Sequence, residues 1–208
     1  MHQTRQEVSM KLPIPRKGTK YVVRAIRDVN NSVPVLIALR EMLKMARTAK
    51  EVEQMIKQKL LKINGRIVED YHESINLFNI LEADKSYVLT LSPTGRFVFE
   101  ETKAKSERLC KVINKTLIKK GKIQLNMHEG SNFITSEKIE VGDSVYVDFT
   151  GRIKKHVALE KGKSCFIIGG KYSGSHGTVE KIEGRKVTIN LKEKGISTTL
   201  DKKLVVVL

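Results

Sequence analysis

Lysine and arginine are the side chains of this chain that most clearly indicate what it could bind. The sequence has 39 lysines and arginines against 23 aspartates and glutamates, which gives a formal net charge of +16. A surplus of that size over globular sequence predicts a polyanionic partner, with nucleic acid as the first candidate and an anionic membrane surface as the second. The alternative is a basic, solvated surface that has no partner.

Residues that usually carry catalysis or hold metals are sparse. Cys110 and Cys165 are far apart and belong to no C-x-x-C pair, so we expect two buried thiols rather than a disulfide or a zinc site. The five histidines are scattered, and no serine or cysteine lies in a nucleophile motif. Asp143 and Asp148 fit turn or surface roles better than the role of a general base. The sequence therefore predicts no enzyme activity, no metal, no cofactor and no small-molecule substrate.

A glycine-rich stretch near the C-terminus invites comparison with phosphate-binding loops. The spacing excludes a Walker loop, because Val157 stands five residues before the Gly162-Lys163 pair. A dinucleotide fingerprint is excluded as well, because the stretch lies between expected strands. What remains is a G-x3-G-x2-G-x-V pattern of turn glycines with side chains suited to phosphate contact or base stacking: Gly170, Gly174 and Gly177, with Lys163, Lys171, Tyr172 and His176.

Two basic helices are expected in the first half of the chain. Residues 33–47 carry an apolar stripe at helical spacing. On the same segment, Arg40, Lys44 and Arg47 repeat at i, i+4 and i+7, so they would share one face. A stripe of cations is usually the solvated side of a helix, but this one contains no acid and is followed by a second basic helix.

The stretch from residue 48 to residue 68 carries that second helix and a hairpin. Thr48 and Glu51 have the spacing of a capping box, which predicts a helix start. The dipeptide Asn64-Gly65 between two apolar-containing runs predicts a tight hairpin. The helix would place Lys50, Gln54 and Lys57 on one side and Val52 and Ile56 on another, and the hairpin would add Lys62 and Arg66.

The N-terminal segment, residues 1–32, is basic and poorly periodic. Pro13 and Pro15 exclude a regular helix, and only residues 21–24 have the pattern of a short strand. The segment is either a frayed terminus or an arm that orders when it lies along phosphates. Its candidate phosphate contacts are Arg16, Lys17, Lys20 and Arg24.

The rest of the chain is expected to be rich in β-strands. Alternating apolar residues and turn signals predict strands around the turn at 92–95, at 109–118 and 122–127, and after residue 140. The apolar run 203–208 should pair into a barrel, because an exposed apolar edge would aggregate. We therefore expect an α+β multidomain protein with a basic extension (1–32), a small α+β domain (33–84), a central β-rich domain (85–157) and a C-terminal β-barrel (158–208).

The expected location follows from what the sequence lacks. No apolar run approaches the roughly 20 residues that are needed to cross a bilayer. The N-terminus also has no apolar segment of the secretory type. We expect a soluble, cytoplasmic protein that does not associate with a membrane.

Two motifs resemble known RNA-binding elements. Residues 33–84 resemble the S-four-like RNA-binding fold, with its I-N-G-x-x-V signature at residues 63–68. Residues 163–190 resemble a KOW motif, which is built on an SH3-like barrel. Their order, with a β-rich domain between them, is similar to the archaeal and eukaryotic small-subunit ribosomal protein family called S four e. The segments PIPRKGTKYVVR and TGRF also look like that family, and the resemblance covers nearly the whole chain.

The resemblance implies a structural protein of the small ribosomal subunit that binds small-subunit rRNA and neighbouring ribosomal proteins and does not homo-oligomerise. It carries RNA contacts over to the loop 169–177 and to the basic residues of the S-four-like surface, Arg40, Lys44, Arg47, Lys50, Lys57, Lys62 and Arg66. Leu12 departs from the pattern, since a Trp before Pro is common there. The lack of a tail after the barrel favours an archaeal-type member.

Three alternatives stay open. The first is an RNA-binding accessory protein. The second is an RNA-modifying or tRNA-charging enzyme with an S-four-like appendage, although residues 85–157 are too short for a catalytic domain of substantial size. The third is a KOW-type transcription elongation factor, against which the S-four-like segment argues.

Overall fold

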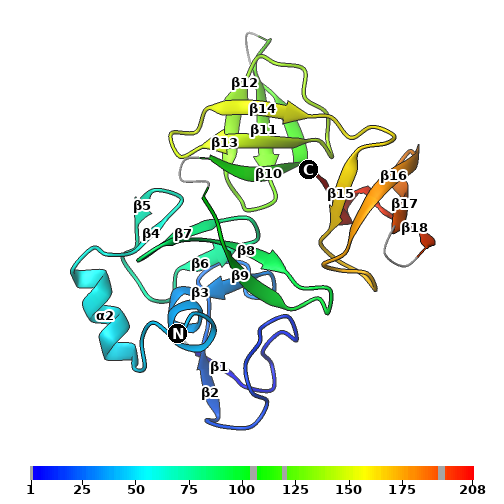
Figure 1. Cartoon of the computed structure of the whole chain (residues 1–208). Helices are drawn as coiled ribbons and strands as arrows, with labels where there is room; N and C mark the ends of the chain where they lie inside the picture. The colour runs from blue at the N-terminus through cyan, green and yellow to red at the C-terminus, as the bar shows by residue number, and fades with distance from the viewer. Residues whose placement is uncertain (1, 104–106, 119–120, 192–194) are drawn as a thin grey trace. The chain divides into compact units, whose positions relative to one another are not determined.

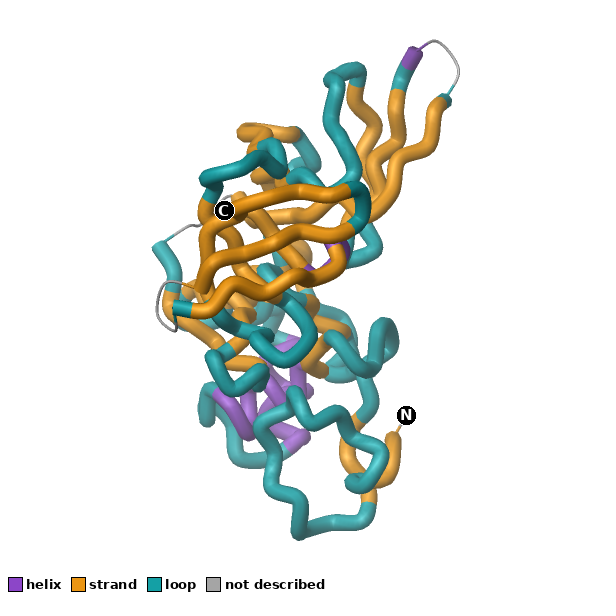
Figure 2. The backbone as a smooth tube through the Cα atoms, turned by 90° about the vertical axis from the view of Figure 1, so that its right-hand side faces the viewer, coloured by secondary structure: helices purple, strands orange, loops and turns teal. Residues whose placement is uncertain are grey.

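The computed structural model describes residues 2–103, 107–118, 121–191 and 195–208. The chain divides into two compact units, Met1–Leu91 with Arg96–Ser106 and Ser92–Gly95 with Glu107–Leu208. Strand dominates the described chain, and its α-helices lie in the first unit (Figure 1, Figure 2). Among the described residues, no helix is long and apolar enough to span a membrane.

The N-terminal segment is a folded lobe rather than a frayed terminus. Strand β1 (His2–Thr4) pairs antiparallel with β2 (Tyr21–Val23). Between them, the guanidinium of Arg5 donates to the carbonyl oxygens of Thr19 and Pro15, each at 2.7 Å. The sequence indicated ordered structure only at residues 21–24. A loop that is held by the hydrogen bonds of one arginine has no repeating pattern of apolar residues that could reveal it.

The first helix is shorter than expected, and the prediction of a helix over residues 33–47 is wrong. The α-helical turn α1 (Val35–Ile37) continues into the π-helical η1 (Ala38–Met42). Lys44 then adopts a left-handed backbone with a φ of 56°. The next amide bonds back to the carbonyl oxygen of Leu39 at 2.8 Å. A left-handed residue with a backward hydrogen bond ends a helix, so the chain turns away here.

Helix α2 (Ala49–Lys57) begins where the capping box predicts. The hydroxyl oxygen of Thr48 accepts a hydrogen bond from the amide of Glu51 at 3.3 Å. In return, the Glu51 carboxylate accepts one from the amide of Arg47 at 2.7 Å. Val52 is fully buried and anchors the helix on the core. The first turn of α2 is therefore stabilised by its own sequence.

The Asn-Gly hairpin leads into a five-stranded sheet. Asn64 and Gly65 both have positive φ, 51° and 78°, as a two-residue hairpin turn of type I′ requires. The sheet has the order β5-β4-β7-β8-β9, and β3 pairs with β6 beside it. The strands are β3 (Ser32–Pro34), β4 (Lys62–Ile63), β5 (Arg66–Ile67), β6 (Ser74–Asn76), β7 (Ile80–Glu82), β8 (Ser86–Leu91) and β9 (Phe97–Glu101). The domain boundary that we expected after residue 84 therefore falls between two adjacent strands of one sheet.

The second unit contains a five-stranded antiparallel sheet in the order β12-β11-β10-β13-β14. The strands expected at 109–118 and 122–127 are confirmed as β10 and β11, with small shifts at their ends. One face of the sheet carries an apolar core that includes Cys110 and Leu125. The strands are β10 (Glu107–Leu117), β11 (Ile123–Met127), β12 (Asn132–Thr135), β13 (Ser144–Asp148) and β14 (Ile153–Val157).

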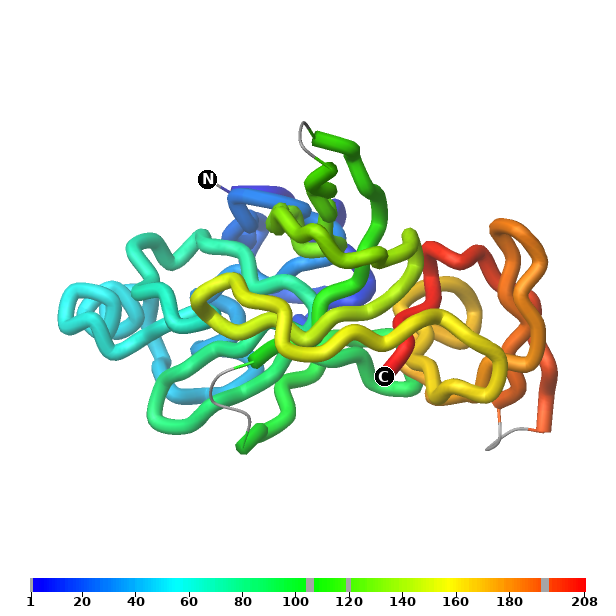
Figure 3. The backbone as a smooth tube through the Cα atoms, turned by 90° about the horizontal axis from the view of Figure 1, so that it is seen from above, coloured from blue at the N-terminus to red at the C-terminus, as the bar shows by residue number. Residues whose placement is uncertain are grey.

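A second five-stranded sheet follows, in the order β18-β17-β16-β15-β19. The three valines of the C-terminal strand are fully buried, and that strand pairs with β15, as we expected. Figure 3 shows this red segment beside the yellow and orange strands. The elements are β15 (Ser164–Ile167), β16 (His176–Glu183), β17 (Lys186–Leu191), β18 (Ile196–Asp201), the 3-10 turn η3 (Lys202–Leu204) and β19 (Val205–Val207).

A buried lysine links the two sheets of the second unit. Lys111 of β10 is 1% exposed, and its ammonium donates to the carbonyl oxygens of Lys202, at 2.6 Å, and of Val205. Beside it, the hydroxyl of Ser144 accepts a hydrogen bond from the amide of Val207 at 3.1 Å. Burial and the nearby charge of Lys202 lower the pKa of Lys111 to about 7. We call this set of contacts the Lys111 seam.

Candidate nucleic-acid interface

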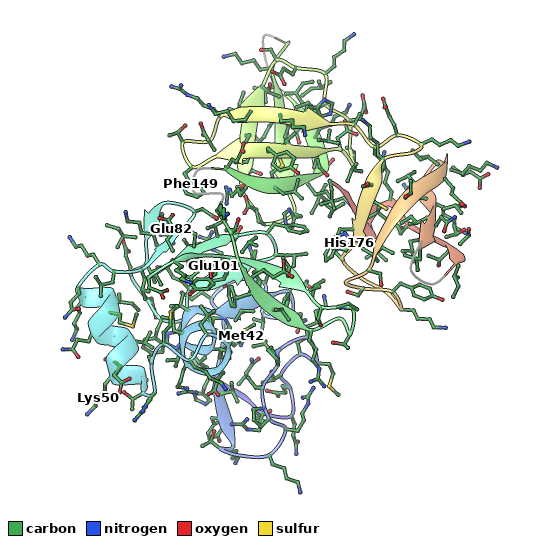
Figure 4. All side chains as sticks on the ribbon, viewed as in Figure 1. Met42, Lys50, Glu82, Glu101, Phe149 and His176 are labelled. Carbon is green, nitrogen blue, oxygen red and sulfur yellow. The ribbon has the colours of Figure 1, made fainter. Side chains whose placement is uncertain are left out.

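Three exposed lysines lie on α2 and on the hairpin that follows it. Lys50 and Lys57 lie seven residues apart on α2, so they share one side of the helix, and Lys62 lies in β4. All three side chains are exposed, and Figure 4 shows Lys50 at the start of α2, extending away from the ribbon. Within the described chain, none of the three ammonium groups makes a hydrogen bond or an ion pair. We call Lys50, Lys57 and Lys62 the α2–hairpin cations.

The cations expected on the first helix do not share a helical face. Arg40 lies in η1, while Lys44 and Arg47 lie in the connection that leads to α2. The Arg40 guanidinium donates to the Glu41 carboxylate at 2.9 Å, with both side chains about one-third exposed. Because the helix ends at Met42 and Lys44 has a left-handed backbone, the i, i+4, i+7 argument for one stripe fails. Lys44 and Arg47 are nevertheless exposed.

Arg66, on the rim of the hairpin, has an acidic partner. Its guanidinium forms an ion pair with the carboxylate of Glu73, which is much less exposed than the arginine. The same carboxylate also accepts the backbone amides of Glu69 and Asp70. Part of the positive charge of Arg66 is therefore neutralised inside the fold, so Arg66 is a weaker candidate than the α2–hairpin cations.

The basic residues of the N-terminal lobe differ in their exposure and in the contacts that they make within the lobe. Arg16 donates to the carbonyl oxygen of Val8 at 3.2 Å and helps to close the lobe. The Lys20 ammonium lies 5.3 Å from the ring centroid of Tyr21. Lys17 and Arg24 are exposed. All four remain candidate phosphate contacts.

The glycine-rich loop departs in one respect from the prediction of three turn glycines. Gly170 and Gly174 have positive φ of 86° and 83°, as turn residues would. Gly177 instead lies in β16, and a Cβ there would stand 2.4 Å from a methyl of Ile189 and 2.9 Å from the carbonyl oxygen of Asn190. Its role is close packing of two strands, so the assignment of Gly177 as a turn glycine is wrong.

The side chains around that loop are partly committed to the fold. Tyr172 packs against the apolar core of its sheet, and the ammonium of Lys171 lies 5.6 Å from its ring centroid. The exposed ring of His176, labelled in Figure 4, lies 5.0 Å from that of Phe166. Lys163 is exposed at the start of the sheet. The loop thus offers Lys171 and the imidazole of His176 to a partner, while Lys163 lies at the opposite end of β15.

The predicted contacts fall into two sets, because the structure assigns them to different units. The first unit holds Arg16, Lys17, Lys20, Arg24, Arg40, Lys44, Arg47, Lys50, Lys57, Lys62 and Arg66, and the second holds Lys163, Lys171, Tyr172 and His176. The sequence reasoning did not single out Tyr21 or Lys111. Alternation along β2 could have found Tyr21, because Val22 beside it is buried. No sequence pattern indicates that Lys111 is buried. The residues on both sides of it in β10 are buried as well, so this part of the strand shows no alternation of buried and exposed positions.

Both cysteines are free and buried, as we expected. Burial raises the pKa of each thiol, to about 11 for Cys165. Within the described residues, no group of three or more His, Cys, Asp or Glu side chains could hold a metal ion.

Comparison with known proteins first defines a class. A model of the S4 domain matches residues 39–76, the segment that carries η1, α2 and the hairpin. The chain is therefore an S4-domain protein. A second model, described as ribosomal family S4e, matches residues 83–153.

Similar proteins then identify the family. The small ribosomal subunit protein eS4 of Methanococcus maripaludis (strain C6) is 32% identical over 188 residues, which cover 83% of this chain and 77% of that protein. The eS4 protein of Archaeoglobus fulgidus is 28% identical over 99% of this chain and 93% of its own. The crystal structure of 30S ribosomal protein S4e from Thermoplasma acidophilum superposes with a TM-score of 0.74 at 26% identity, covering 86% and 95% of the two chains. The chain belongs to the ribosomal S4e family.

Proposed function

We propose that this chain is a structural component of the small ribosomal subunit that binds small-subunit rRNA. The observation that carries the proposal is the set of α2–hairpin cations, three exposed lysines that have no acidic partner among the described residues and that lie inside the segment matching the S4 domain. Exposed lysines neutralise phosphates and release counterions, and a folded basic face can match the shape of structured RNA. The ribosomal S4e family is not an enzyme class, so the role is one of binding and assembly.

The second unit would supply a further anchor. We infer that its C-terminal sheet is an SH3-like barrel of the KOW type, supported by the turn glycines Gly170 and Gly174 and by the pairing of β19 with β15. Lys171 and His176 would contact rRNA from the loop side of that barrel, and Lys163 from the opposite end of β15. Tyr172 is the least available of the expected contacts, because its ring already packs on the core.

The domain division supports several separate anchors on RNA. The proposed parts are 1–32, 33–84, 85–157 and 158–208, with the qualification that β8 and β9 pair with the sheet of the preceding part. The proposed partners are small-subunit rRNA and neighbouring ribosomal proteins, and the proposed location is the cytoplasmic ribosome. The names of the similar archaeal proteins support this assignment.

Co-sedimentation tests the proposal. A lysate from cells that make the protein is separated on a sucrose gradient at moderate salt, and the chain is followed with an antibody. We expect it in the fractions of the small subunit, and we expect ribonuclease treatment before centrifugation to release it. If the protein stays at the top of the untreated gradient, it is not a ribosomal component.

A further inference from the structure

A groove in the first unit lies between the N-terminal lobe and the first helix. It encloses about 480 Å³, which lies within the range of about 300–1,000 Å³ that is typical of sites for small organic ligands. The lobe contributes Arg5, Lys17, Thr19 and Tyr21, and η1 contributes Arg40. Folding thus brings residues from two separate segments around one hollow.

Part of the lining of the groove is apolar. Ile14, Pro15 and Val23 line it and keep part of their surface exposed. Val22, Leu36 and Ile37 also line it, and because all three are buried, their positions are fixed by the core of the unit. An apolar surface offers nothing to a phosphate, but it suits the flat face of an aromatic ring.

Tyr21 stands at this groove as an exposed aromatic ring. Tyr21 is 49% exposed, although its strand neighbour Val22 is buried. The His2 ring packs edge-on against it with a centroid distance of 4.6 Å, and the ammonium of Lys20 lies 5.3 Å from its centroid. An accessible aromatic face within a basic surface is the platform on which unpaired nucleobases stack.

The cations at the groove differ in how far their hydrogen bonds within the fold leave them available to a ligand. The guanidinium of Arg5 is committed to the loop, where it donates to Thr19 and to the carbonyl oxygen of Pro15. Arg40 shares its charge with Glu41. Lys17 is exposed and, over the residues that the structure describes, makes no hydrogen bond or ion pair. Arg5 therefore shapes the groove, and Lys17, with the free edge of Arg40, can reach a phosphate.

We propose that this groove binds one unpaired nucleotide of the RNA partner. The base lies against Tyr21 and the apolar lining, and the phosphate of the same nucleotide lies at Lys17 and Arg40. The inference rests on the proposed function, because it requires an RNA partner, and it adds contact with a base to the phosphate contacts of the α2–hairpin cations. A free nucleoside monophosphate has the same chemistry, so the test must separate the two sources.

Affinity and its salt dependence provide the first test, with full-length protein and purified small-subunit rRNA as the probe. Tyr21→Leu keeps apolar bulk but removes the aromatic face, so we expect about tenfold weaker binding with an unchanged salt slope. Tyr21→Phe should bind like the wild type. Lys17→Gln should lower the salt slope by about one, because it removes one phosphate contact.

A fluorescence measurement keeps the test independent of any effect on folding. The chain has no tryptophan, so Tyr21→Trp places a single indole at the groove. We expect rRNA to quench its emission by stacking and millimolar adenosine or uridine monophosphate to leave the emission unchanged.

The outcomes separate the two proposals. If the wild type binds rRNA but Tyr21→Leu binds equally well and the indole is not quenched, the groove assignment is wrong and the proposed function stands. If a monophosphate quenches the indole and rRNA does not, the site takes free nucleotide and the RNA assignment is overturned. If the wild type does not bind rRNA at all, both proposals fail.

Discussion

Lysine serves opposite purposes in two regions of this molecule. On α2 and its hairpin, Lys50, Lys57 and Lys62 are exposed and have no acidic partner within the described chain. In the second unit, Lys111 is buried, and two backbone carbonyl oxygens accept its hydrogen bonds. This difference shows that the lysines behind the positive net charge do not all have the same role. Surroundings decide whether a lysine is available to phosphate or is part of the scaffold.

The largest effect is expected at the Lys111 seam and concerns stability against pH. The pKa of Lys111 is lowered from 10.5 to about 7 in the folded protein. The unfolded chain therefore binds more protons between those values, and stability rises with pH across that window. Relative to Lys111→Met, the free energy of unfolding of the wild type should rise by about 1 kcal/mol per pH unit, or about 3 kcal/mol from pH 7 to 9.5.

Denaturant unfolding of both proteins at several pH values measures this difference. The two buried thiols, whose pKa values are raised, lower stability at alkaline pH in both proteins, so their effect cancels. A constant difference between wild type and Lys111→Met from pH 7 to 9.5 would show that Lys111 does not lose its proton on folding.

The next largest effect is expected on RNA binding at the α2–hairpin cations. Replacing Lys50, Lys57 and Lys62 together by Gln removes three phosphate contacts. Binding to small-subunit rRNA at about 0.1 M salt should weaken by about a hundredfold, and the magnitude of the slope of log K against log salt should fall by roughly two to three. Filter binding at four or five salt concentrations measures both quantities.

A matched triple variant controls for net charge. Lys85, Lys154 and Lys181 are also exposed, but each already has a carboxylate partner, at distances between 2.5 and 3.9 Å. Replacing these three by Gln changes the net charge equally and should alter the slope by less than one unit. Equal losses in the two triple variants would mean that overall charge, and not the α2–hairpin surface, drives binding.

A smaller effect is expected from Gly177, on stability rather than on RNA contact. A methyl group there would collide with Ile189 and the backbone of Asn190, so Gly177→Ala should destabilise the protein by about 2 kcal/mol. Gly130→Ala is the comparison, since its Cβ meets nothing within 4 Å and only its positive φ of 90° is strained. If Gly177→Ala loses no more stability than Gly130→Ala, the conclusion that β16 and β17 pack closely at Gly177 is wrong.

The smallest effect is expected at the start of α2. Thr48→Ala removes the acceptor for the amide of Glu51 and should cost about 1 kcal/mol of stability. Thr48→Asp should restore most of it, because aspartate caps helices well. Thermal unfolding followed by circular dichroism measures both variants. An unchanged midpoint for Thr48→Ala would show that the cap does not stabilise the helix.

Local signals in the sequence predicted local structure well. The capping box of Thr48 and Glu51 and the turn at Asn64-Gly65 depend on residues a few positions apart, and both are confirmed. The turn signals and the apolar residues of 109–118 and 122–127 likewise predicted β10 and β11, and the continuous apolar run at the C-terminus predicted β19, whose three valines are all buried.

Features that depend on distant contacts could not be predicted. The first helix ends at Met42, and the left-handed residue that turns the chain away after it is Lys44 rather than a glycine, so no sequence signal marks this end. The packing of Gly177 depends on β17, and the burial of Lys111 depends on the C-terminal segment. The groove at Tyr21 forms only when the N-terminal lobe folds against η1. Such sites need three-dimensional proximity that no pattern along the chain records.

Lysine acetylation of the protein bound to small-subunit rRNA tests the central claim most directly. The reagent modifies exposed amines, and mass spectrometry reads each lysine in the free and bound protein. Lys50, Lys57 and Lys62 should be modified in the free protein and protected in the complex, while Lys85 and Lys181 stay modified in both. Equal modification of Lys50, Lys57 and Lys62 with and without rRNA would contradict the claim that this surface holds the RNA.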